Sequence, residues 1–319
     1  MGLGHYEINE DMSHRLNIMK SVFMVCVVFI HSYALPGLPY ALDVPRYVAE
    51  CKEIVVNGIC RVAVDGFFFI SGLLLFAKEF TWLGNLRKKA KSILVPYLLI
   101  NSFWIIFFRA VNSFEMTAHY FADEAYQINE WIDVAEAYLN PMPLYYPFWF
   151  LRDLMILNIF AALIKVMIDR FPILILLVMI ALQIKVISLP LLVSNNSFCM
   201  FALGGYFVKY AVDAGKLDQI SLWYIGTLFA GLILAKLYLF KDLKLIFSLY
   251  IVCGIFFYYR IAGKILESKM ARHVLWCSQF TFFVYGFHEF YMAMGKRVLM
   301  SVIPQYGIIQ FLEFLCCHL

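Results

Sequence analysis

Two ionisable side chains in the first apolar stretch indicate chemistry inside a membrane. Lys20 and His31 lie eleven residues apart in MKSVFMVCVVFIHSY. Eleven helical residues at about 100° each return to nearly the same face, roughly 16 Å further along the axis. A cation near one membrane surface would thus share a helix face with a deeply placed imidazole. This geometry suits a long substrate whose charged end and reactive end are far apart.

Each of these two residues also has a purely structural interpretation. The imidazole of His31 could be satisfied by a neighbouring carbonyl or hydroxyl, and Lys20 could be an ordinary lysine that extends its ammonium to the interface. Ionisable groups at membrane depth are nevertheless rare and tend to be functional. A neutral histidine at about pH 7 can accept a proton from a reacting group. His31 is therefore the candidate catalytic residue.

The composition is that of a membrane protein rather than a soluble domain. Of the 319 residues, 63% are hydrophobic and 15% are charged, and the mean hydropathy is +0.78. The formal net charge of +4 is too small to argue for nucleic acid, and the basic residues cluster between apolar spans. We expect a multi-pass integral protein of the cell membrane, in contact with lipid and without a nucleic-acid partner.

Ten apolar segments are long enough, or nearly so, to cross a hydrocarbon layer of roughly 30 Å. Because lipid offers no partner for open backbone groups, these segments are predicted to be helices. The predicted fold is an all-α bundle forming a single domain over residues 1–319. Nine spans is the alternative, because only a Gly-Lys-Arg turn at residues 295–297 separates the last two segments. The segments are residues 18–38, 58–77, 92–111, 148–168, 173–192, 197–210, 222–239, 245–261, 276–294 and 298–317.

Loop charge predicts the orientation of this bundle. The loop after the second segment carries five cations, and four more run from Arg260, at the end of the eighth segment, to Arg272. Residues 112–147, by contrast, carry six carboxylates and neither Lys nor Arg. Positively charged loops favour the cytoplasmic side, so the basic loops and both termini are expected to be cytoplasmic. Four cations that fall on the outer side argue against this orientation: Lys241, Lys244, Lys296 and Arg297.

Three shorter features refine the topology. The first segment is apolar like a signal peptide, but its polar lead of about seventeen residues and His31 favour an uncleaved span. Residues 130–139 carry apolar side chains at helical spacing and are expected to lie along the membrane surface. Cys51 and Cys60 are expected near the outer side, where a disulfide between them is one alternative.

Several short motifs, in order along almost the whole chain, resemble those of the acyltransferase 3 family of integral membrane acyltransferases. The Lys20-to-His31 spacing is similar to that family's basic residue, ten-residue gap and histidine. GFFFISGLLLF from Gly66 resembles its aromatic run and Ser-Gly, and LRKKAKSILVPYLL from Leu86 resembles its basic loop and Pro-Tyr. Its later signatures are similar to FWFLRDLMIL from Phe148, FALGGYFV from Phe201 and FTFFVYGFHEF from Phe280.

The chain departs from the family pattern at three places. Asp65 and Gly66 stand where proline often precedes the aromatic run, and a glutamate follows His288 where proline is common. Lys89 and Lys91 stand where arginines are frequent, which keeps the charge but loses bidentate phosphate geometry. The choice of acyl donor and acceptor is therefore left open.

The resemblance implies transfer of an acyl group, usually acetyl, from cytoplasmic acyl-CoA to a hydroxyl on a glycan or lipid-linked sugar at the outer face. Lys20, with Arg87, Lys89 and Lys91, would attract the donor phosphates, although any cytoplasmic loop should be basic. His31 would act as a general base or would take the acyl group before passing it on, and both routes stay open. Acyl-CoA (acetyl-CoA) is the only cofactor implied, and no metal site is visible.

Five further residues are candidates for the acceptor side. Arg61 and Asp65 are four apart, which suits either a simple intrahelical ion pair or the lining of an acceptor path. His288 lies in the ninth segment and is preferred over the glutamate after it, because successive helical residues point about 100° apart. Trp149 and Arg152 could stack on and hydrogen-bond a sugar, although a Trp at an interface is often only an anchor.

Two other classes of protein share these features. A transporter or flippase would also have about ten helices, and Asp65, Arg61, His31 and Glu289 could form a proton relay. No inverted repeat of hydropathy is visible, and an anionic donor explains the basic loop better. A non-catalytic subunit that kept the fold is the third class. The sequence leaves open the acceptor, the acyl chain and the oligomeric state.

Overall fold

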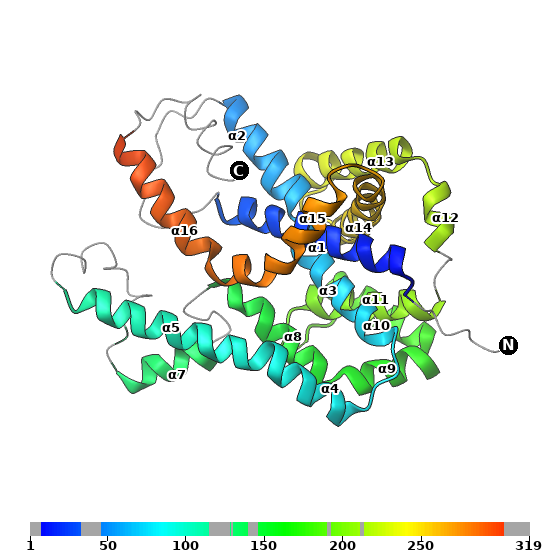
Figure 1. Ribbon diagram of the computed structural model, residues 1–319. Coiled ribbons are helices and arrows are strands. Elements are labelled where there is room, and N and C mark those ends of the chain that lie inside the picture. The colour runs from blue at the N-terminus through cyan, green and yellow to red at the C-terminus, as the bar shows by residue number, and fades with distance from the viewer. Residues whose placement is uncertain are drawn as a thin grey trace. The chain divides into compact units, whose positions relative to one another are not determined.

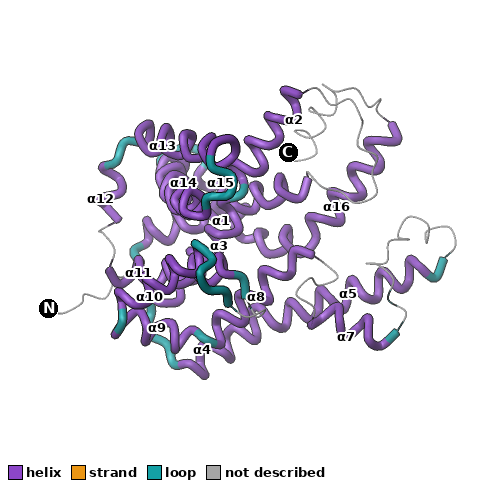
Figure 2. The backbone as a smooth tube through the Cα atoms, turned by 180° about the vertical axis from the view of Figure 1, so that it is seen from behind, coloured by secondary structure: helices purple, strands orange, loops and turns teal. Residues whose placement is uncertain are grey.

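The described part of the chain is built from helices. The computed structural model (Figure 1) describes residues 8–32, 46–114, 128, 130–139, 146–189, 193–210 and 214–302. Every regular element among these residues is a helix (Figure 2). Within these described ranges, five helices are long and apolar enough to cross a membrane: Glu10–His31, Ala49–Phe76, Trp82–Asn112, Leu222–Leu239 and Lys244–Leu266. The all-α prediction is confirmed, while the count of ten spans and the cytoplasmic termini stay predictions.

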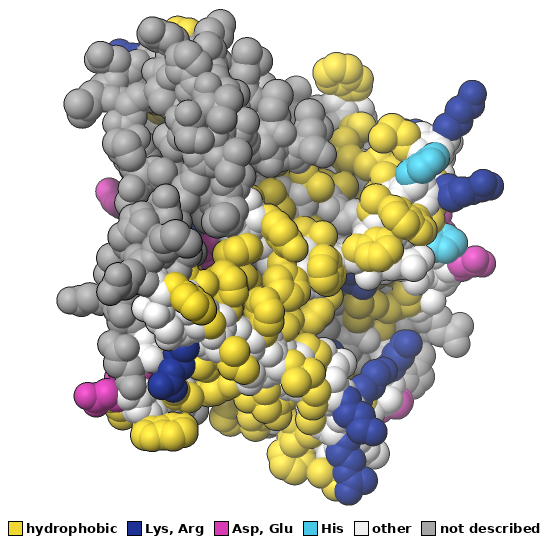
Figure 3. All heavy atoms as spheres, turned by 60° about the vertical axis from the view of Figure 1, so that its left-hand side comes forward, with side chains coloured by type: hydrophobic (Ala, Val, Ile, Leu, Met, Phe, Trp, Pro, Cys, Tyr) yellow, Lys and Arg dark blue, Asp and Glu magenta, His cyan; other side chains and the backbone are white. Residues whose placement is uncertain are grey.

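The chain packs as two compact units, Met1–Leu73 with Tyr206–Leu319, and Leu74–Gly205. This division groups residues by their contacts and does not test whether the chain folds as one domain, so the single domain stays a prediction. On the face in Figure 3, hydrophobic side chains cover much of the described surface. Leu99 and Ile106 are 65% and 68% exposed, as expected of side chains that face lipid.

The first unit is built around α1 (Glu10–Ser32), which contacts η1, α14, α15 and α16. At its centre Phe23 is fully buried and packs edge-on against Phe67 and Tyr258, with ring centroids 5.7 and 5.2 Å apart. Gly66 approaches α1 so closely that a Cβ there would overlap the Phe23 ring. The other elements are α2 (Arg46–Glu53), η1 (Ile54–Cys60), α3 (Val62–Phe76), α12 (Ala214–Gln219), α13 (Leu222–Leu234), η6 (Ala235–Leu239), α14 (Lys244–Leu266), α15 (Ala271–Cys277), η7 (Ser278–Phe280) and α16 (Thr281–Val302).

The second unit contains a helix pair that the sequence predicted as a single span. The segment 148–168 is divided into α8 (Trp149–Ile159) and α9 (Ala161–Arg170). Trp82 donates from Nε1 to the Ile159 carbonyl at 2.8 Å, and Asn85 donates to the Asn158 side chain at 3.1 Å. Both hydrogen bonds stabilise the end of α8, where the helix is interrupted. The remaining elements are α4 (Trp82–Lys89), η2 (Ala90–Leu94), α5 (Val95–Asn112), α7 (Trp131–Leu139), η5 (Tyr146–Phe148), α10 (Pro172–Gln183) and α11 (Asn195–Tyr210).

One expectation about local structure is wrong, one alternative is excluded, and one expectation is confirmed. The turn expected at residues 295–297 is absent, because α16 continues through it to Val302; most of the segment 298–317 lies outside the described residues. Cys51 and Cys60 are free thiols on one continuous helical run, about 13 Å apart along its axis at 1.5 Å per residue. They therefore cannot form the disulfide considered above. The helix expected at 130–139 is α7.

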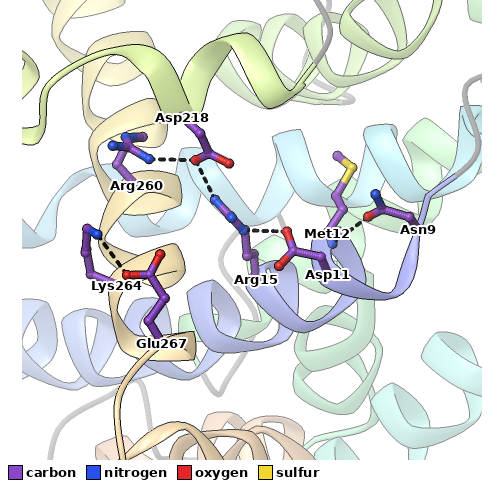
Figure 4. Close-up of polar contacts among 8 residues, drawn as sticks. All are labelled: Asn9, Asp11, Met12, Arg15, Asp218, Arg260, Lys264 and Glu267. Carbon is purple, nitrogen blue, oxygen red and sulfur yellow. Dashed lines mark hydrogen bonds and ion pairs between the residues drawn. The ribbon is translucent and has the colours of Figure 1, made fainter.

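An ionic cluster joins three elements of the first unit (Figure 4). Arg15 of α1 and Arg260 of α14 both donate to Asp218 Oδ1 of α12, at 2.7 and 2.6 Å. Arg15 Nε also lies 2.7 Å from Asp11 Oδ2. Gly263 makes room for this arginine, since a Cβ there would lie 2.7 Å from Arg15 Nη1. Burial alone would raise the pKa of Asp218, but the hydrogen bonds and charges of the two arginines hold the pKa below its ordinary value.

We expect Asp218→Asn to destabilise the first unit by about 1 kcal/mol at neutral pH, because it leaves two largely buried guanidiniums without their shared carboxylate. A lowered folded-state pKa contributes stability above the unfolded pKa of about 3.9, and this contribution is lost as pH falls through the folded value. The variant should therefore lose less thermal stability than the wild type below about pH 4. The measurement is the apparent Tm in detergent as a function of pH, above and below about pH 4, with Asp242→Asn at an exposed position as the control. Parallel curves of Tm against pH for the wild type and Asp218→Asn would refute the expectation.

Candidate functional site

The structure brings together two histidines that are far apart in the sequence. His31 lies at the end of α1, and His288 lies in the second turn of α16 and is only 4% exposed. Their ring centroids are 5.0 Å apart and the rings meet edge to face at 70°. His288 Nδ1 lies 2.9 Å from the Tyr285 carbonyl. Since a carbonyl only accepts, Nδ1 carries the proton in the neutral ring, and Nε2 is the basic nitrogen.

Arg61 and Asp65 lie at the junction of η1 and α3: Arg61 directly precedes α3, and Asp65 is in its first turn. Arg61 is exposed, whereas Asp65 is only 8% exposed. Arg61 interacts electrostatically with His31 and with Asp65. In the described part of the chain these two charged residues make no direct ion pair, so that interpretation of their spacing is not supported.

Lys20 shares an unbroken helix with His31. The residues lie on α1, which runs from Glu10 to Ser32, so the eleven-residue spacing holds over roughly 16 Å. Lys20 is half-buried, and its ammonium donates to the Asn17 side chain at 3.2 Å. An asparagine leaves the positive charge uncompensated, so the ammonium suits an anionic group such as a phosphate.

The other predicted donor-binding cations belong to the second unit. Arg87 and Lys89 are in the last turn of α4, and Lys91 is in η2. Arg87 and Lys91 are exposed, while Lys89 is half-buried. With Lys88 they make four cations within five residues, which suits the charge of a diphosphate. The structure describes each unit by itself and does not place these cations beside Lys20.

Trp149 and Arg152 lie at the start of α8, also in the second unit. Arg152 donates from Nη2 to Asp153 Oδ1 at 2.8 Å. Asp153 is fully buried, and its other oxygen accepts from the Ser194 backbone N–H and the Ser197 hydroxyl, both at 3.0 Å. This network ties α8 to the start of α11, so Arg152 has a structural role whether or not it also contacts a sugar.

Sequence reasoning missed one charged residue near Arg61. Lys236 lies on η6 inside the apolar span Leu222–Leu239, and it interacts electrostatically with Arg61 and Asp65. A lysine within an apolar span is itself the signal that could have revealed it. Among the residues that the structure describes, no group of three His, Cys, Asp or Glu side chains could hold a metal ion.

Comparison with known proteins identifies the family. The profile of the acyltransferase domain of the acyltransferase 3 family matches residues 13–317. The chain is also similar to the succinoglycan biosynthesis protein ExoH of Rhizobium meliloti (strain 1021), with 23% identity over 218 residues. That match covers 67% of this chain and 59% of ExoH. No solved structure matches the chain. Because the family profile covers nearly the whole sequence, the chain belongs to this acyltransferase family.

Proposed function

We propose that the protein is a multi-pass O-acyltransferase of the cell membrane. It would move an acyl group, most simply acetyl, from cytoplasmic acyl-CoA to a hydroxyl of a cell-surface or lipid-linked carbohydrate. The observation that carries this proposal is the contact between His31 and His288 in a member of an acyltransferase family. Arg61 interacts electrostatically with His31, and Lys20 lies on the same helix as His31. The role in succinoglycan biosynthesis named for ExoH supports a carbohydrate acceptor.

His31 is the group best placed to handle the proton of the acceptor. In direct transfer, its basic nitrogen takes the hydroxyl proton while the hydroxyl oxygen forms a bond to the thioester carbonyl carbon. The carbon–sulfur bond then breaks, and the thiolate leaves with the proton that the imidazolium returns. In the alternative route, the basic nitrogen of His31 forms a bond to the acyl carbon, the carbon–sulfur bond breaks, and the thiol leaves with the proton of the imidazole. The acceptor hydroxyl then forms its bond to the acyl carbon while the carbon–nitrogen bond breaks, and the hydroxyl proton returns to the imidazole.

Arg61 and His288 have supporting roles in either route. The Arg61 guanidinium would stabilise the negative charge that develops on the carbonyl oxygen, as a positioned cation does in the transition state of acyl transfer. His288, with Nδ1 directed to the Tyr285 carbonyl, would present Nε2 toward the acceptor hydroxyl or toward the His31 imidazole.

Lys20 and the cluster of Arg87, Lys89 and Lys91 would hold the donor. These side chains fit the phosphates of acyl-CoA by charge, and Lys20 lies roughly 16 Å along α1 from His31. That separation would let one elongated molecule contact Lys20 with its phosphates while its thioester reaches His31. Asp65, Trp149 and Arg152 are the remaining candidates for contacts with the sugar.

Reconstitution in proteoliposomes tests this function against the transporter alternative. Acyl-CoA carrying a labelled acyl group is supplied on one side, and a mixed polysaccharide or lipid-linked oligosaccharide pool on the other. We expect label on carbohydrate hydroxyls, measured by glycan mass spectrometry and lost on mild alkaline treatment. Movement of unmodified carbohydrate without label would instead favour a transporter. Label that never leaves the donor would exclude acyl transfer to these acceptors.

A further inference from the structure

A π-helical segment directly precedes Arg61. The helical run from Arg46 to Phe76 contains η1 (Ile54–Cys60), where the backbone pairs i to i+5, between α2 and α3. A π-turn takes up an extra residue, and the helix beyond it is rotated by about 100° relative to an uninterrupted α-helix. The π-segment therefore determines which side of the helix Arg61 occupies.

Three side chains from the hairpin of α13, η6 and α14 donate to consecutive carbonyls of η1. Lys236 Nζ donates to the Asn57 carbonyl at 2.6 Å, and Tyr258 donates its hydroxyl to the Ile59 carbonyl at 3.0 Å. Tyr250 donates to the Gly58 carbonyl between them. Each carbonyl has two lone pairs, so these bonds add to those of the helix itself. We call Lys236, Tyr250 and Tyr258 the three-donor clamp.

The clamp depends on close approach and on an aromatic cradle. A Cβ at Gly58 would lie 2.7 Å from Ile233 Cγ2, so a larger residue there would push η1 away from the hairpin. The Lys236 ammonium lies 4.6 Å from the Tyr250 ring centroid and 5.5 Å from that of Phe247. A cation inside an apolar span is costly unless such contacts compensate it. These contacts fix the ammonium at the Asn57 carbonyl.

We propose that Lys236, Tyr250 and Tyr258 are positioning residues of the acyl-transfer site, which hold η1 in its π-helical form so that Arg61 faces His31. The inference rests on the proposed function, because it assigns the clamp to the same site. Arg61 is the first residue after η1 and interacts electrostatically with His31, Asp65 and Lys236. A change in the pairing of η1 would therefore act on the site through Arg61.

The first arm of the test measures the geometry of η1 without using activity. Cys60 is the last residue of η1, and its side chain hydrogen-bonds with Cys26 of α1. In a variant that keeps only these two of the eight cysteines, copper-phenanthroline should form an intrachain disulfide, quantified by peptide mass spectrometry. Adding Lys236→Met and Tyr250→Phe should slow its formation at least about tenfold, because a disulfide forms only within a narrow range of Cα separations.

Matched variants separate this effect from general loosening. Tyr238→Phe changes an exposed tyrosine on the same η6 segment and should leave the disulfide rate within about twofold. Lys236→Arg keeps a cationic donor and should retain most of the rate. An unchanged rate in the Lys236→Met, Tyr250→Phe variant would show that the clamp does not hold η1, and would overturn the proposal.

The second arm asks whether Lys236 acts through Arg61. Lys236→Met should lower kcat for acyl transfer about 10- to 100-fold, as a small misplacement at a reacting centre does. In the Arg61→Gln background the same change should have almost no further effect, because the two losses are not independent. Losses that multiply would contradict the proposal. A parent protein that transfers no acyl group would refute the proposed function, and the disulfide rate would still decide on the clamp.

Discussion

Replacing His31 with alanine is expected to lower the rate of acyl transfer by about 10²- to 10⁴-fold, the range that a positioned general base contributes. The effect should be on kcat, because the imidazole acts on the reacting proton or acyl carbon and not on the donor phosphates. Carbohydrate acylation in membranes that contain equal amounts of inserted protein, followed by glycan mass spectrometry, would measure it.

Two comparison variants make this result specific. His273→Ala removes an exposed histidine on α15 and should leave the rate unchanged. Lys20→Ala should raise KM for acyl-CoA with a smaller loss of kcat, since Lys20 is expected to bind the donor rather than to react. If both His31→Ala and Lys20→Ala insert normally and still add acyl mass at the wild-type rate, the mechanism is wrong.

The second large effect is expected on stability, from Gly66→Ala. The added methyl group would overlap the Phe23 ring, and that ring is fully buried and fixed by Phe67 and Tyr258. Because the packed ring has no free space to turn into, α1 and α3 must separate to accommodate the methyl group. Overpacking of this kind costs about 3 kcal/mol. The apparent Tm in detergent should fall by several degrees, and acyl transfer should fall with it.

A glycine in a different environment provides the control for this substitution. Gly231 lies on α13, and a Cβ there would meet no atom within 4 Å, so Gly231→Ala should be neutral or slightly stabilising. Phe23→Leu combined with Gly66→Ala should recover part of the lost Tm by making room for the methyl group. Equal Tm values for Gly66→Ala and Gly231→Ala would show that the α1–α3 contact is less tight than described.

The predictions that held depend on local periodicity. The shared face of Lys20 and His31 follows from helical geometry alone, and α1 is indeed unbroken between them. The start of α1 at Glu10, eight residues before the predicted span, also had a local signal. The Asn9 side chain accepts from the Met12 N–H at 2.8 Å, and Glu10 and Asp11 lie in the first turn. Hydropathy counts these polar residues against a span, so the predicted span begins eight residues later than the helix.

The features that escaped prediction depend on contacts between distant residues. The break between α8 and α9 requires Asn85 and Trp82 to donate to residues more than seventy positions away. The contact between His31 and His288 likewise joins the first and the last of the described helices. A contact between distant residues produces no periodic pattern in a single sequence. His31 and His288 were therefore each predicted as a site residue, but the contact between them was not predicted.

The π-helical segment η1 has a consequence for the evolution of this family. An extra residue within a helix arises by insertion of one codon and is removed by deletion of one. Relatives without the bulge should therefore be one residue shorter between the positions of Ile54 and Cys60. In those relatives we expect an apolar residue at the position of Lys236, since no widened turn would need its ammonium. An alignment without this one-residue gap would pair Arg61 with a residue of the relative that is not its structural equivalent.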